Sequence, residues 1–145
     1  MDITISFPGG KRVDADLGGH VVATDQSHAH GGGGSAPEPF DLFLASLATC
    51  AGIYVLGFCQ ARGIPTEGIT LVQRSTNDPE TKRLALVELE VGLPPSFPEK
   101  YRTAVLKAAE GCRVKKTLLD PPEVRVVPRE STEPSIAVVE RRAAS

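Results

Sequence analysis

The stretch from Leu42 to Cys59 contains eighteen residues and no Asp, Glu, Lys, Arg or His. An uncharged run of this length lies at the lower limit for a membrane-spanning helix. It also contains Ser46, Thr49 and two glycines, is the single such run in the chain, and has polar, strand-like sequence on both sides. We therefore expect a helix buried on nearly all sides within a small α+β fold, and no membrane partner.

Short β-type runs and a glycine-rich loop precede this helix. Glycine-containing turns separate three runs, over residues 2–7, 11–16 and 19–24. The loop SHAHGGGGSAPEP follows, and four consecutive glycines interrupt any helix or strand. Ser35 and Glu38 have the spacing of a capping box, which predicts a helix start near residues 37–40. Gly63 predicts the helix end.

The second half of the chain predicts further strands and a broken helix. Two β runs, 68–76 and 81–94, surround the turn NDPE, and the second alternates apolar residues with Glu88 and Glu90, as a strand with one wet face does. Residues 96–120 are helical in pattern, with capping-box spacing at Ser96 and Glu99, an interruption at Gly111 and a new helix start at Cys112. Two final β runs cover residues 122–130 and 135–140.

This order of elements predicts an α+β fold with a largely antiparallel sheet and helices on one face. At 145 residues, the chain (1–145) is expected to form one domain.

Charge and cysteine content narrow the function classes. A net charge of −2 with scattered Lys and Arg gives no electrostatic reason to expect a nucleic acid or an anionic membrane as a partner. Three cysteines argue against a disulfide framework and for a reducing compartment. The start MDITISFPGGKRV is not a signal peptide, so we expect a cytoplasmic protein.

The cysteines differ in their surroundings along the sequence. Helical neighbours of Cys50 carry no charge, so its pKa should be raised and the thiol passive, unless a cation reaches it from elsewhere in the chain or from a second subunit. Relative to Cys50, Cys59 lies on the opposite side of the helix and about 13.5 Å further along its axis. This separation excludes a Cys50–Cys59 disulfide, so we expect Cys59 to be a packing residue. Cys112 stands at an expected helix start beside Arg113 and two lysines, which favours the thiolate, although an incidental cysteine in a solvated basic turn is the alternative.

Other site patterns are weak. His28 and His30 supply at most two metal ligands in a glycine-rich loop, with no CxxC or HExxH motif to complete a set. We expect a solvated loop and no metal site. The glycine run lacks a following GK[ST], so it is no phosphate-binding loop, and no GxSxG elbow of a serine hydrolase is present.

Three segments together resemble the OsmC/Ohr family, the osmotically induced protein C and organic hydroperoxide resistance proteins. They are GGHVVATDQ, APEPFDLFLASLATCAGIYVLGFCQARGI and, about sixty residues after its cysteine, AEGCRVKKTL. The resemblance implies an OsmC-like fold with a long central helix and a second helix, in an interwoven homodimer with active sites at the subunit interface. It also implies an antioxidant peroxidase that reduces organic hydroperoxides or hydrogen peroxide in the oxidative stress response.

The resemblance also assigns roles to residues. Cys50 matches the peroxidatic cysteine and Cys112 the resolving one, and an external dithiol, for which a lipoyl-type dithiol is a candidate, would reduce their disulfide. No metal or bound cofactor is implied. An arginine of the N-terminal β region, held by an acid near the helix start, activates the thiol in this family; Arg12 is the candidate arginine, and Glu38 or Asp41 the acid.

Two departures from the family pattern indicate a divergent branch. The acid expected ten residues before the first cysteine falls on Phe40, and Arg113 replaces the usual proline after the second. A non-enzymatic dimer that binds an apolar small molecule at the subunit interface is therefore the alternative function. A metal-binding module that uses His28, His30 and a cysteine is a third.

Overall fold

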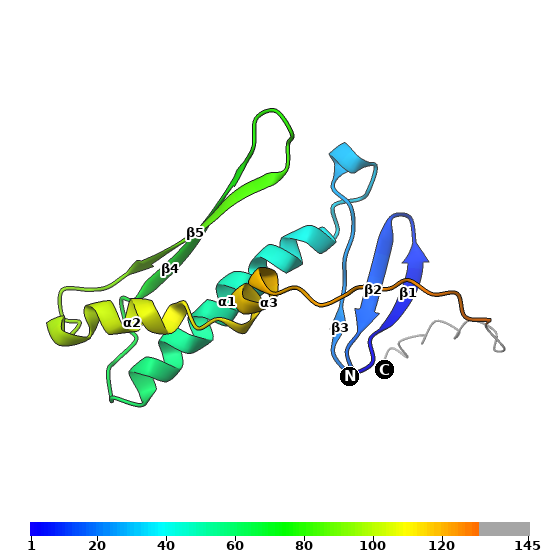
Figure 1. The fold of residues 1–145 in the computed structure, drawn as a ribbon. Helices are drawn as coiled ribbons and strands as arrows, with labels where there is room; N and C mark the ends of the chain where they lie inside the picture. Colours follow the sequence, from blue (N-terminus) through cyan, green and yellow to red (C-terminus); the bar gives the residue numbers. More distant parts are fainter. Residues whose placement is uncertain (131–145) are drawn as a thin grey trace, which may run out of the picture. The chain divides into compact units, whose positions relative to one another are not determined.

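The structure, a computed structural model, describes residues 1–130, which belong to two compact units. Unit 1 contains Met1–Pro39 together with the residues from Glu123 onward, and unit 2 contains Phe40–Pro122. The described residues form antiparallel sheets, one long helix and shorter helices, as Figure 1 shows. The predicted α+β class, the antiparallel pairing and the long helix are confirmed.

Unit 1 carries a small sheet with the strand order β1-β2-β3, formed by Thr4–Gly9, Arg12–Asp16 and Val21–Val22. β1 and β2 pair antiparallel from Thr4↔Asp16, with an irregularity before Gly9. Gly9 and Gly10 both have positive φ, so the β1–β2 turn needs residues without a Cβ. The three predicted N-terminal strands are confirmed.

Side chains of unit 1 are buried in an unusual pattern. Its buried residues, among those described, are polar: Asp14, Thr24 and Asp25. Apolar side chains of its strands are exposed, with Phe7 79% and Val21 66% accessible to solvent. Polar contacts rather than an apolar core therefore hold this unit together.

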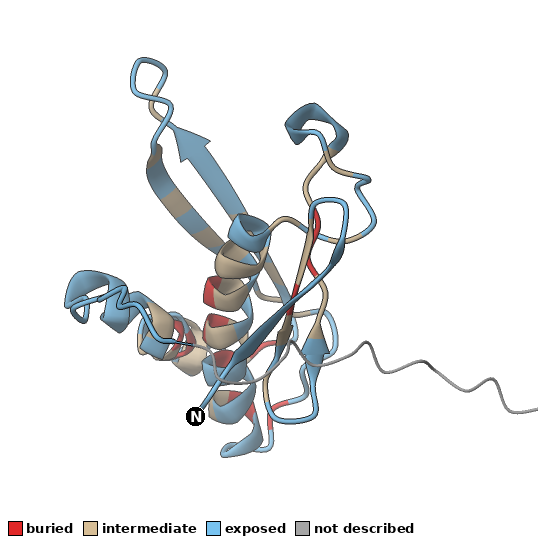
Figure 2. Ribbon diagram, turned by 90° about the vertical axis from the view of Figure 1, so that its right-hand side faces the viewer, coloured by how far each residue is buried: buried red, intermediate tan, exposed pale blue. Residues whose placement is uncertain are grey.

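Helix α1, Pro39–Gln60, is the longest element of unit 2. Its buried side chains recur every four residues at Leu47, Ala51, Val55 and Cys59, which places them on one face, as the red bands in Figure 2 show. Gly63 has φ +61° and follows the last turn, which confirms the predicted glycine end of this helix. By length and composition alone α1 could cross a membrane, with mean hydropathy 2.0. The expectation of a helix buried on nearly all sides is wrong for the described chain, because the buried residues lie on one face and Ile53, Tyr54 and Leu56 are exposed.

Strands β4, Thr70–Asn77, and β5, Leu84–Gly92, form an antiparallel hairpin in unit 2. Val87 and Leu89 pack against the core, while Glu88 and Glu90 are exposed, so the predicted single wet face is confirmed. Gln73 donates a hydrogen bond to the carbonyl of Leu44 in α1 at 3.1 Å, which ties the hairpin to the helix.

The remaining elements of unit 2 are the 3-10 helix η2, Glu99–Tyr101, and the helices α2, Arg102–Ala109, and α3, Arg113–Leu119. Cys112 is the N-cap of α3 and its sulfur accepts a hydrogen bond from the N–H of Lys115. The predicted break at Gly111 and the new helix start at Cys112 are therefore confirmed.

Three local predictions are wrong. Ser35 is not the N-cap of α1, because the helix begins at Pro39, four residues later; the N–H and hydroxyl of Ser35 donate to the carboxylate of Asp25. Ser96 forms no capping box, since the N-cap of η2 is Pro98 and Glu99 pairs with Arg102 instead. Residues 122–130 form no strand, and the predicted strand at 135–140 lies outside the described residues.

Candidate functional site

Two of the predicted site residues, Cys50 and Cys112, lie side by side in unit 2. Cys50 is near the middle of α1 and partly exposed, and Cys112 is fully buried at the start of α3. The sulfur of Cys112 lies 3.8 Å from the carbonyl oxygen of Leu47, one turn before Cys50 on α1. The two thiols shift each other's pKa, Cys112 lowering that of Cys50 and Cys50 raising that of Cys112, and neither forms a disulfide.

The surroundings of Cys50 favour its thiolate. A hydrogen bond from the backbone N–H of Val114 is the largest influence and lowers the pKa of Cys50, against the opposing effect of burial. The thiol of Cys112, the N–H of Arg113 and the positive charge of Arg113 lower the pKa of Cys50 further. The cation that the sequence argument requires is thus supplied at least in part by Arg113, within the same unit.

The pKa of Cys112 is shifted in the opposite direction. Burial is the largest influence and raises the pKa of Cys112, and the hydrogen bond to Cys50 raises it further, although the N–H of Lys115 opposes both. The direction predicted for Cys112 from its sequence neighbours is therefore wrong. For Cys50 the condition attached to the prediction is met, because a cation and N–H donors reach it from outside its own helix. Sequence neighbours alone decide neither pKa, because Cys50 receives its donors from α3, while the cationic side chains beside Cys112 extend into solvent and leave the sulfur buried.

The other predicted residues are Arg12 and Glu38 in unit 1 and Asp41 in unit 2. Arg12 lies on β2 in unit 1, where its Nη2 atom forms an ion pair with Asp14 at 2.6 Å. Asp41 lies in the first turn of α1, where the positive end of the helix dipole stabilises a negatively charged carboxylate. The activation of Cys50 by Arg12 stays a prediction.

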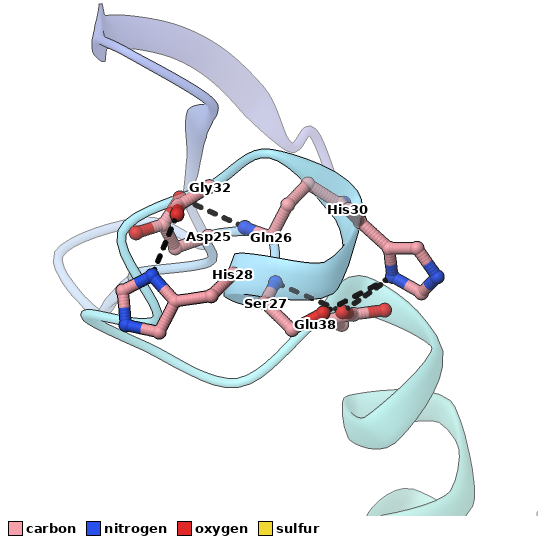
Figure 3. Close-up of polar contacts among 7 residues, drawn as sticks. All are labelled: Asp25, Gln26, Ser27, His28, His30, Gly32 and Glu38. Carbon is pink, nitrogen blue, oxygen red and sulfur yellow. Dashed lines mark hydrogen bonds and ion pairs between the residues drawn. The ribbon is translucent and has the colours of Figure 1, made fainter.

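Glu38 forms hydrogen bonds with Ser27 and His30 that connect the two ends of the glycine-rich loop (Figure 3). Its Oε1 atom accepts hydrogen bonds from the N–H of Ser27 at 2.9 Å and from Nδ1 of His30 at 2.8 Å. Hydrogen bonds from Ser27 and then His30 lower the pKa of Glu38 to about 2. Glu38 is thus an ionised loop anchor in this arrangement.

A second carboxylate anchors the same loop from its other side. Asp25 accepts hydrogen bonds from the N–H of Gln26 and from both the N–H and the hydroxyl of Ser35, at 2.8, 3.0 and 2.7 Å. The hydrogen bonds from Ser35 are the main reason that the pKa of Asp25 falls to about 2. Asp25 is not among the residues predicted from the sequence, although an Asp near a glycine-rich turn is a known loop-forming signal.

The histidines of the loop bind protein atoms. Nδ1 of His28 lies 3.1 Å from the carbonyl oxygen of Gly32 and His30 contacts Glu38, as Figure 3 shows. Among residues 1–130 there is no group of three or more His, Cys, Asp or Glu side chains that could hold a metal ion.

An apolar groove lies in unit 2 beside the cysteine pair. It has a volume of about 530 Å³. Leu47 and Lys115, the residues whose backbone atoms contact the Cys112 sulfur, both line it. Its other walls come from β5, α2 and α3, and are mainly leucine and valine side chains, with the charged side chains of Glu88 and Glu110.

Comparisons with solved structures reveal the same fold in proteins of low sequence identity. A Psychrobacter arcticus protein, provisionally described as an osmotic stress induced and detoxification response protein, is 21% identical, with TM-score 0.67 over 79% of this chain and 85% of its own. An OsmC-like protein from Mycoplasma pneumoniae is 16% identical, with TM-score 0.63 over 83% and 87%.

A third structure has a ligand in its active site. A Vibrio cholerae protein provisionally described as an organic hydroperoxide resistance protein, with captopril bound in one of the active sites, is 17% identical, with TM-score 0.55 over 81% of this chain and 84% of its own. At these identities the likeness establishes the fold alone.

Sequence comparison gives the family. A search of curated proteins found no match. The model of the family described as OsmC-like protein matches residues 32–127, which include α1, the β4–β5 hairpin and both cysteines of the pair. Since this match covers well over half of the chain, the protein belongs to the OsmC-like family, as one of its divergent members.

Proposed function

We propose that this protein is a thiol-dependent peroxidase in which Cys50 attacks the hydroperoxide and Cys112 resolves the product. One observation carries the proposal: the two thiols lie side by side, with hydrogen bonds from Val114 and Cys112 directed at Cys50. A peroxidatic thiol must be ionised, and its partner must be close enough to form a bridge. Membership of a family that includes organic hydroperoxide resistance proteins supports the same activity.

The chemistry balances with the two thiols and an external reductant. The Cys50 thiolate attacks one peroxide oxygen, the O–O bond breaks, and the other oxygen leaves as an alcohol or water after taking up a proton. Cys50 is then a sulfenic acid. The sulfur of Cys112 attacks it, an S–S bond forms and water leaves. A dithiol, for which a lipoyl-type compound is a candidate, transfers two electrons and restores both thiols.

The positions of the thiols fit this order of events. Cys50 is partly exposed and Cys112 is buried, so a peroxide can reach Cys50 first. The pKa of Cys50 is lowered while the pKa of Cys112 is raised, so the pair holds one thiolate at the accessible position. All three cysteines of the chain are free, which fits the reducing cytoplasm proposed from the sequence.

A homodimer is part of the proposal. Helix α1 exposes apolar side chains opposite its buried stripe, with Ile53 68% and Leu56 42% accessible. Exposed apolar side chains on a core helix are typical of a surface that another subunit covers. Analytical ultracentrifugation should find twice the chain mass, and a monomer at micromolar concentration would contradict the dimer.

Peroxide consumption with a dithiol reductant tests the activity. We expect Cys50→Ser to abolish turnover, and Cys112→Ser to permit attack on peroxide but no intramolecular disulfide. Cys59→Ala is the control, since Cys59 is buried in the core away from the pair and should be dispensable for turnover. Unchanged turnover in Cys50→Ser would end the proposal. A peptide map that contains only over-oxidised Cys50 would remove the resolving role of Cys112.

The second candidate is a non-enzymatic dimer that binds an apolar small molecule. The groove beside Cys112 supports it, because a volume of about 530 Å³ lies within the range of small-molecule sites and its walls are mainly apolar. A measured Cys50 pKa above about 8.5, the value of a free thiol, would favour this function over the peroxidase.

A further inference from the structure

The turn between α2 and α3 packs along α1 beside three residues in successive turns of the helix. The sulfur of Cys112 contacts the carbonyl of Leu47 at 3.8 Å, and the pKa of Cys50, three residues further along α1, is lowered by Cys112, Arg113 and Val114. One turn further along α1, the ring of Tyr54 lies against Gly111. Leu47, Cys50 and Tyr54 are three and four residues apart, so they share one face of the helix.

Gly111 allows a very close approach beside Tyr54. A Cβ atom added to Gly111 would lie 3.2 Å from both Cδ1 and Cε1 of Tyr54, and 3.0 Å from the carbonyl oxygen of Ala108. These distances are tighter than ordinary van der Waals contacts, so a side chain at position 111 would displace either the ring or the turn. Since Cys112 is the next residue, movement of the turn would move its sulfur relative to Cys50.

We propose that Tyr54 and Gly111 are positioning residues that set the distance between Cys112 and Cys50. The inference rests on the proposed function for its biological role, but the contact itself is independent of peroxide. The ring of Tyr54 on α1 limits how closely the turn can approach the helix. Glycine at position 111 has no Cβ, so the turn can pack directly against this ring.

Formation of the Cys50–Cys112 disulfide measures this positioning directly. Diamide removes two electrons and two protons from a thiol pair and becomes the corresponding hydrazine, so it reports on thiol proximity without peroxide. We expect Gly111→Ala to slow disulfide formation about 10- to 100-fold, because small displacements of reacting groups cost rates of that order. Peptide mapping by mass spectrometry would identify the bridged cysteines and their rate of formation.

A compensating change separates positioning from a general loss of structure. In the double variant Gly111→Ala, Tyr54→Ala, the ring that the new Cβ meets at 3.2 Å is gone while the 3.0 Å contact with the Ala108 carbonyl remains, so disulfide formation should be faster than in Gly111→Ala alone. Gly57→Ala is the matched control, since a Cβ at Gly57 meets nothing within 4 Å, and it should leave the rate unchanged. Circular dichroism would verify that each variant is folded.

Two results would overturn the inference: an unchanged rate in Gly111→Ala, or a slow rate that Tyr54→Ala does not rescue. A parallel series with an organic hydroperoxide separates this inference from the proposed function. If the unmodified protein consumes no peroxide while the diamide series behaves as expected, the peroxidase proposal fails and the positioning role stands. If peroxide is consumed but the diamide series shows no effect, the reverse holds.

Discussion

The two units of this chain are stabilised in different ways. Unit 2 has an apolar core in which residues such as Val105, Ala51 and Cys59 are fully buried. Unit 1 buries polar side chains instead, and its glycine-rich loop is held by the carboxylates of Asp25 and Glu38. The cysteine pair lies in unit 2, the unit with the apolar core. The unit with polar contacts should respond more strongly to pH.

The largest expected effect is the loss of a core ring in unit 2. Phe97 is 4% exposed, so Phe97→Ala should lower the free energy of unfolding by about 3–5 kcal/mol. Phe7→Ala in unit 1 is the control, since Phe7 is 79% exposed and should cost less than about 1 kcal/mol. Denaturant titration at one protein concentration measures both. Equal losses would mean that another surface covers unit 1, and would break the comparison.

Replacing one glycine in each unit by alanine gives a second comparison of their stability. A Cβ at Gly32 would lie 2.0 Å from the backbone oxygen of Gln26, whereas one at Gly92 would lie 2.3 Å from the hydroxyl of Thr70. A backbone atom cannot rotate away as a hydroxyl can, so Gly32→Ala should destabilise by about 1–3 kcal/mol and Gly92→Ala by less. Thermal melts of the two variants test this order, and the reverse order would contradict it.

Acid should loosen unit 1 before unit 2. Asp25 and Glu38 each have a pKa of about 2 in the folded chain, below the ordinary values of 3.8 and 4.5. Because the folded pKa is depressed, their stabilising contribution is complete above about pH 4.5 and is lost as the pH falls towards 2. Amide hydrogen exchange should therefore rise first at residues 25–38. In Glu38→Gln this acid-induced change should be smaller, and simultaneous loosening of both units would refute the prediction.

Ser35→Ala should have the smallest effect. It removes the hydroxyl donor to Asp25 but keeps the backbone N–H that also binds the carboxylate. The pKa of Asp25 should therefore rise from about 2 towards 3.8 without reaching it. An NMR titration of the carboxyl carbon measures this change. A fully ordinary pKa would mean that the backbone contact is lost as well.

Local patterns predicted the helices and strands well where one segment alone decides them. The uncharged run predicted α1, Gly63 its end, the alternation in β5 its wet face, and Gly111 the break before α3. The capping boxes predicted at Ser35 and Ser96 failed because the helices begin further along the chain, α1 at Pro39 and η2 after Pro98. Spacing alone does not specify which acceptor a hydroxyl or N–H will find.

The candidate site, too, has properties that the sequence predicted and properties that it could not predict. The sequence, through its resemblance to the OsmC/Ohr family, selected Cys50 and Cys112 as the pair, and the structure brings them together. It could not predict their pKa directions, because the N–H groups that favour the Cys50 thiolate come from α3. The prediction that Cys112 begins a helix was a usable signal, since the first N–H groups of a helix lack partners within it.

By itself the sequence determined the long apolar helix and its glycine end, because these depend on periodicity and residue type within one segment. The identity of the two thiols came from the resemblance to the OsmC/Ohr family. Only the tertiary structure decided which thiol is the more acidic and which carboxylates hold the glycine loop. Those properties depend on contacts between residues far apart in the chain, such as Leu47 and Cys112 at a separation of 65 positions. Burial and hydrogen bonding set a pKa through neighbours in space, and folding alone brings those neighbours together.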